Sequence, residues 1–182
     1  MLSWKNHGKG VQMAALNLVN QLRFTRSEFR NGFSDVSEEE GFKRLLPMNS
    51  IAWIVGHLAW HEQSYWLKKA QGIVLFQELQ EITAFGKPPG EVSLHKMKDL
   101  WEIVTKEADQ YLESLSPTDL EKNMLVNGKP LSANIGTMIS RMIYHYWYHN
   151  GEMQAIRQIL GHKDLPDFVS DEIESVGRFY LD

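Results

Sequence analysis

Two histidines four residues apart, His145 and His149 in the segment RMIYHYWYHNGE, could bind a metal ion from one face of a helix. Residues at positions i and i+4 lie on the same face of an α-helix. A third histidine, His57, falls in an otherwise apolar row with Trp53 and Trp60 on an earlier helical pattern. An imidazole taken out of water needs partners for its nitrogens, because an unmet polar group costs ~1–3 kcal/mol. A single divalent cation would satisfy all three rings.

Three neutral imidazoles from two facing helices leave a position open on the metal, which is typical of catalytic rather than structural zinc. Zinc and nickel are the leading candidates for this metal. Iron and manganese stay as alternatives, because the intrinsic affinity order does not identify the metal. The alternative interpretation is that each histidine packs in the core as an aromatic ring and bonds a neighbour without a metal. The pair spacing alone is a weak motif.

Two further residues lie near the predicted metal site. Glu152 follows His149 by one turn and is expected to orient a ligand or act as a base, unless it pairs with Arg141 instead. His61 is expected to line the pocket at the edge of the row that contains His57. The catalytic residues stay unknown, because the sequence contains no G-x-S-x-G motif, no glycine-rich phosphate loop and no cysteine.

The helical spacing of apolar residues predicts four long helices to hold these side chains, at residues 10–31, 50–71, 93–115 and 132–160. Asn49 or Ser50 is expected to cap the second helix. The long connection 72–90 is expected to hold one short helix, and Asn127 with Gly128 predicts a small irregular hairpin. The fold class is therefore all-α, an antiparallel four-helix bundle in a single domain, 1–182. The bundle covers about 10–161, and an acidic tail, 162–182, holds a short helix near 169–176.

Composition narrows the function further. With no cysteine, the chain cannot form disulfides or bind zinc through thiolates, so any thiol chemistry needs a thiol from a substrate. A net charge of −4 with scattered basic residues argues against nucleic-acid binding and favours a small-molecule or protein partner. No apolar stretch reaches the ~20 residues of a bilayer span, and no signal peptide is recognisable, so we expect a cytoplasmic location.

The segments NSIAWIVGHLAWHEQSYW and RMIYHYWYHNGEMQAIRQILGH resemble the DinB-like superfamily of metal-binding four-helix bundles. That superfamily includes thiol-dependent S-transferases and mycothiol-dependent maleylpyruvate isomerases. Gly56, His57 and Leu58 match its GHL element. A second element, H-x-x-x-H-x-G-[EQ], is matched by His145, His149, Gly151 and Glu152.

The resemblance implies that His57, His145 and His149 are the metal ligands. It also implies a metal-dependent enzyme that uses a small-molecule thiol or activated water, of the S-transferase or hydrolase type. The alternative is a noncatalytic stress-response protein that binds a metal or another ligand. Surplus aromatic residues and the habit of the family predict a homodimer.

Overall fold

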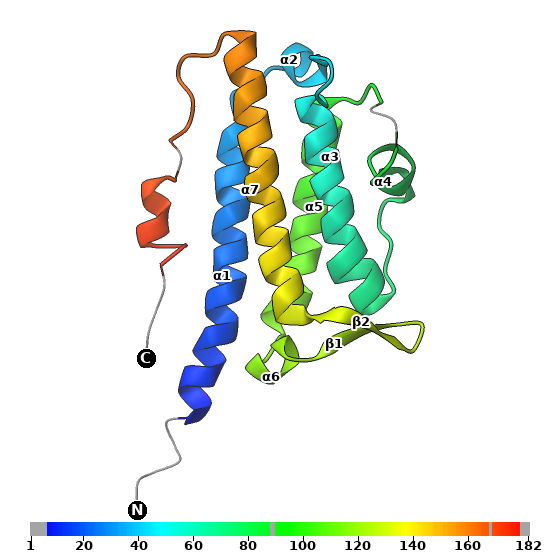
Figure 1. Cartoon of the computed structure of the whole chain (residues 1–182), viewed down its shortest axis with the longest axis vertical. Helices are drawn as coiled ribbons and strands as arrows, with labels where there is room; N and C mark the ends of the chain where they lie inside the picture. The colour runs from blue at the N-terminus through cyan, green and yellow to red at the C-terminus, as the bar shows by residue number, and fades with distance from the viewer. Residues whose placement is uncertain (1–6, 88–89, 168, 179–182) are drawn as a thin grey trace, which may run out of the picture.

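The computed structural model describes residues 7–87, 90–167 and 169–178. It confirms the all-α prediction, with four long helical elements running side by side (Figure 1). These elements are α1 (His7–Phe33), α3 (Ile51–Glu62) with its π-helical continuation η1 (Gln63–Lys69), α5 (Leu94–Glu113) and α7 (Ile135–Leu160). The closest pairs are α1 with α7 and α3 with α5. The space between α3 and α7 is therefore bounded by helices from two different pairs.

Side-chain caps fix where three of the long helices begin. The Ser50 hydroxyl accepts a hydrogen bond from the amide of Trp53, so Ser50 rather than Asn49 caps α3. Ser93 caps α5 and Asn134 caps α7 in the same way. The predicted fourth helix starts slightly too early, because residues up to Asn134 belong to a strand. Gly161 ends α7 in the left-handed region at φ 96°, which favours glycine.

The connections contain short elements. They are α2 (Glu38–Phe42), α4 (Gln77–Ile82), α6 (Pro117–Leu120), β1 (Asn123–Val126), β2 (Lys129–Asn134) and η2 (Asp171–Glu174). The two strands pair antiparallel around Asn127 and Gly128, both at positive φ, which confirms the predicted hairpin. A capping box between Ser37 and Glu40 starts α2, a helix that apolar periodicity did not reveal. In the tail, the expected helix is a single 3₁₀ turn, η2.

The core fills the space between the four helices, with Leu22, Leu58, Trp101 and Met142 fully buried. Ile159 lies three heptads after the buried Met138 on α7, yet it is 64% exposed. A row of residues at heptad spacing drifts by ~20° per heptad on a straight α-helix, so three heptads carry the row out to solvent. Among the described residues, none of the helices combines the length and apolar composition needed to cross a membrane.

The π-helical end of α3 changes which residues share a face with His57. Four-residue steps overshoot a full α-turn by ~40°, so a regular helix would rotate residues 61, 65 and 69 progressively away from residue 57. A π-helix bonds i to i+5 and has wider turns, which cancels this drift. Because η1 spans Gln63–Lys69, Tyr65 and Lys69 stay close to the row of His57 and His61.

Candidate metal centre

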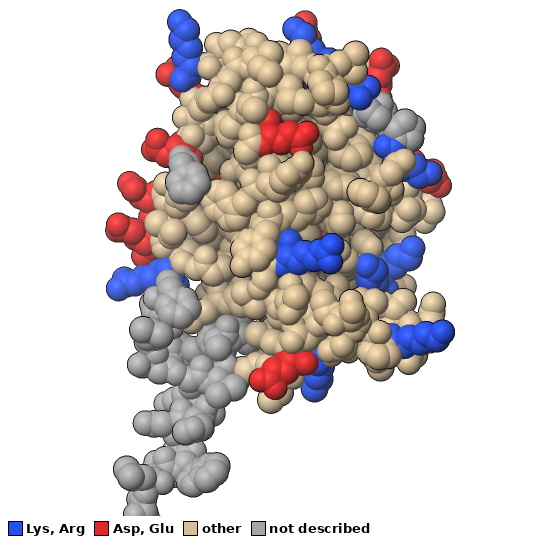
Figure 2. Space-filling model, in the orientation of Figure 1, with Lys and Arg blue, Asp and Glu red and all other residues tan. Residues whose placement is uncertain are grey.

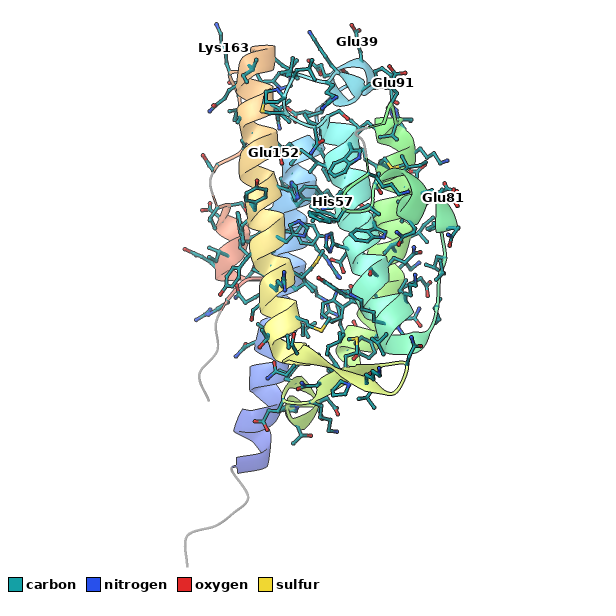
Figure 3. All side chains as sticks on the ribbon, turned by 45° about the vertical axis from the view of Figure 1, so that its right-hand side comes forward. Glu39, His57, Glu81, Glu91, Glu152 and Lys163 are labelled. Carbon is teal, nitrogen blue, oxygen red and sulfur yellow. The ribbon has the colours of Figure 1, made fainter. Side chains whose placement is uncertain are left out.

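The three histidines predicted as ligands converge between α3 and α7. His57, His145 and His149 each present a ring nitrogen, and these three nitrogens all lie within 4.8 Å of one another. The Nε2 atoms of His145 and His149 are 3.0 Å apart. Figure 3 shows His57 in the space between α3 and α7. A tetrahedral cation with ~2.05 Å bonds needs ligand nitrogens roughly 3.3 Å apart, so small side-chain shifts would fit one.

The ring of His57 is held on two sides. Its Nδ1–H donates to the carbonyl oxygen of Thr83 at 2.8 Å, and Trp53 stacks on the ring at 4.7 Å between centroids. Thr83 is fixed in turn, because its hydroxyl donates to the carbonyl oxygens of Gly56 and Leu79. Thr83 follows α4 directly, so the long connection positions a candidate ligand. With Nδ1 protonated, the neutral ring keeps its Nε2 lone pair for a cation.

The glycine before His57 has a packing reason. A Cβ at Gly56 would overlap with the side chains of Met97 and Thr83. Glycine therefore lets α5 and the Thr83 segment approach α3 next to the histidine. Leu58, on the other side of His57, is fully buried in the core. By contrast, a Cβ at Gly151 would enter open space, so local packing does not account for that glycine.

Glu152 orients the third histidine. The Nδ1–H of His149 donates to the Oε2 atom of Glu152 at 2.8 Å, one turn along α7. The carboxylate thus contacts His149 rather than forming the ion pair with Arg141 that the sequence left open. Such an outer carboxylate fixes the tautomer and orientation of a metal-binding imidazole. In Figure 3, Glu152 lies on α7 above the level of His57.

Burial keeps two of the candidate ligands, His57 and His145, neutral. It lowers the pKa of His57 to about 4, and it lowers the pKa of His145 to about 3 with the help of the neighbouring His149 and His57. Neutral imidazole is the form that binds metals, so the folded chain presents ready ligands at neutral pH. The donor set therefore fits a divalent cation that accepts imidazole nitrogen.

His61 lies beside this cluster and borders a cavity. Its ring is 4.4 Å from that of His145 and 4.7 Å from that of His57, between centroids. The Nδ1 atom of His61 is buried and has no partner among the described residues. The adjoining cavity has a volume of about 390 Å³ and is lined by His57, His61, Tyr65, Phe85, Arg141, Met142, Tyr144 and His145.

Glu62 belongs to a second polar cluster in the core, separate from this cavity. Arg26 on α1 holds both carboxylate oxygens of Glu62, at 2.8 and 2.6 Å, and also contacts Asp109 on α5 at 2.6 Å. The Tyr146 hydroxyl donates to Glu62 and accepts from Trp101 Nε1, both at 2.8 Å. One network thus joins all four long helices. Sequence patterns do not reveal this network, because its members lie on four separate segments.

Fold and site together define a class: a helical bundle whose facing helices bring three imidazoles together, where they could hold a metal. The chain belongs to the DinB superfamily, whose family model matches residues 21–153. The matched range includes the GHL element, which begins at Gly56, and the H-x-x-x-H-x-G-[EQ] element, which ends at Glu152, and it confirms the resemblance. A search of curated proteins finds no match to the chain.

Proposed function

We propose that the protein is a metal-dependent enzyme in which His57, His145 and His149 hold a divalent cation. The reaction would be S-transfer from a small-molecule thiol or hydrolysis by activated water. The observation that carries the proposal is the cavity of about 390 Å³ beside the three rings, because His57 and His145 line it directly. A substrate in this cavity would lie next to the open side of the cation, as catalytic sites require.

A bound divalent cation lowers the pKa of a coordinated water or thiol, which makes hydroxide or thiolate available near neutral pH. The chain supplies the remaining functions. Thr83 and Glu152 fix the orientation of two of the imidazoles. The aromatic rings of Tyr65 and Phe85 line the cavity and give it apolar walls. Because the chain contains no cysteine, the thiol must be a co-substrate.

The metal is proposed as zinc or nickel, with iron or manganese as alternatives. A second candidate function is a noncatalytic protein that binds a metal or another ligand in a stress response. The Nδ1 atom of the partly buried His61, which has no partner in the described part of the chain, favours this alternative, because a fourth imidazole beside the cluster could close the coordination of the ion. A third possibility is that the histidines bind no metal and pack in the core. Elemental analysis of protein purified without a metal-affinity column would test it.

The test combines metal binding with turnover. Protein loaded with zinc or nickel would be incubated with small thiols and a panel of electrophilic acceptors and esters. We expect metal-dependent product formation that His149→Ala abolishes together with metal binding. The variant should keep its helical circular dichroism, because a chain of this size has enough apolar core to fold without the ion. Tight metal binding without turnover over a broad panel would favour the noncatalytic alternative.

A further inference from the structure

One cation lines the cavity beside the histidines, and a second lies against the ring of a lining residue. The Arg141 side chain lines it, one helical turn before His145 on α7. The Lys69 ammonium lies 4.3 Å above the ring centre of Tyr65, which also lines the cavity. Lys69 reaches this position through η1, which keeps residue 69 near the row of His57 and His61. The cations therefore approach the cavity from both of the helices that carry the histidines.

Neither cation is neutralised. Among the residues that the structure describes, Arg141 and Lys69 form no ion pair with a carboxylate, and the cavity lining contains no acidic side chain. Other arginines behave differently: Arg23, Arg26, Arg30 and Arg157 each pair with an acid. This local excess of positive charge stands out in a chain whose net charge is −4.

The two charges also act on each other. Burial, followed by the charges of Arg141 and Lys68, lowers the pKa of Lys69. An anion between Arg141 and Lys69 would relieve this repulsion. Figure 2 shows basic side chains in the middle of the face where α7 and α3 lie. A divalent cation on the histidines would add further positive charge to the same cavity.

We propose that the substrate of this site carries a carboxylate, which Arg141 and Lys69 bind, and this inference rests on the proposed function. The planar guanidinium of arginine matches a carboxylate with two parallel hydrogen bonds. Arg141 lies four residues before His145, and the Cβ atoms of such a pair are ~5–6 Å apart, so the carboxylate would be bound on the same side of α7 as the candidate ligand. The exposed rings of Phe85 and Tyr144 at the cavity suit an apolar body between the two ends.

The test uses cobalt(II)-loaded protein and two matched thiols, 3-mercaptopropionate and its methyl ester. Thiolate binding to cobalt produces a charge-transfer absorption, so affinity is read without any turnover. We expect the acid to bind about tenfold more tightly than the ester. Arg141→Gln should remove most of this preference and leave the ester affinity unchanged. Lys69→Gln should reduce the preference to a smaller extent.

Lys163→Gln is the control, because Lys163 is an exposed cation beyond the far end of α7 (Figure 3). This variant should keep the full preference for the acid. Equal affinity for acid and ester in the unmodified protein would overturn the inference, as would an Arg141→Gln variant that keeps the preference. The cobalt spectrum without thiol reports the metal site separately. Failure to bind cobalt would count against the proposed function itself.

Discussion

Hydrogen bonds at Nδ1 decide which nitrogen each imidazole can offer to a cation. His57 and His149 both donate from Nδ1, to Thr83 and Glu152, so their Nε2 atoms carry lone pairs in the neutral rings. The Nε2 atoms of His145 and His149 are 3.0 Å apart. Without a metal, this contact is a hydrogen bond only if His145 carries a proton on its Nε2 atom and donates it to His149. A cation replaces that proton, and His145 must then carry its own proton on Nδ1. Glu152 therefore favours the metal-binding tautomer of His149.

The first prediction concerns Glu152. On the proposed metal site, Glu152→Gln should weaken zinc binding about tenfold, and Glu152→Ala should weaken it further, within the 10–100-fold range typical of such outer carboxylates. The glutamine can still accept from His149 but has lost its charge. Competition against a chromophoric chelator measures the affinity. Glu91→Gln, which alters an exposed carboxylate, should match the unmodified protein. Unchanged affinity in Glu152→Ala would contradict the orienting role.

How much of this site the sequence could predict depends on the kind of contact. His57, His145 and His149 stand out because imidazoles are rare in an apolar row, and the structure brings these three together. The Thr83 carbonyl could not be predicted, because every residue has one and only the path of the chain selects it. The sequence indicates Arg141 only as a partner of Glu152. Its place beside the cavity depends on the cavity itself, which the helical pattern does not specify.

At the scale of elements, the helical spacing of apolar residues predicted the long helices. It did not predict where a helix departs from regular α-helical geometry. The second helix was expected to run evenly over 50–71, but its last turns form η1. A π-helix leaves the apolar pattern almost unchanged over seven residues, so periodicity cannot detect it. Its effect is nevertheless local and specific, since it keeps Tyr65 and Lys69 on the side of His57. Helix caps and turns demand particular side chains, so the sequence could predict the caps and the turn at residues 50, 93, 127 and 161.

The second prediction tests the network that joins the helices. Tyr146→Phe removes the hydroxyl that accepts from Trp101 and donates to Glu62. The indole N–H then stays buried without a partner, so the free energy of unfolding should fall by about 1–3 kcal/mol. Urea denaturation measures this loss. Tyr148→Phe is a matched control on the same helix, because Tyr148 is 71% exposed and its change should stay within ~0.5 kcal/mol. Equal stability of the two variants would mean that the hydrogen bonds of Tyr146 add little to the free energy of unfolding.

At the scale of the whole molecule, the neutral histidines make the metal-free fold sensitive to acid. Burial lowers the pKa of His57 to about 4, of His145 to about 3 and of His61 to about 2. In the unfolded chain these rings titrate near ~6.5. Below that pH the unfolded chain takes up protons that the folded chain does not, so stability is retained above pH ~6.5 and falls as the pH drops toward the folded values.

The last prediction follows from this linkage. Each such histidine should contribute a loss of ~1.4 kcal/mol per pH unit below pH ~6.5, until its folded pKa is reached. Urea unfolding with a chelator present, between about pH 7 and pH 5, measures the slope. His61→Phe removes one of the three groups and should make the slope shallower by about that amount, while the rings of His57 and His145 stay in place. If the variant keeps the full slope, His61 is protonated as readily in the folded chain as in the unfolded one, and burial does not hold it neutral.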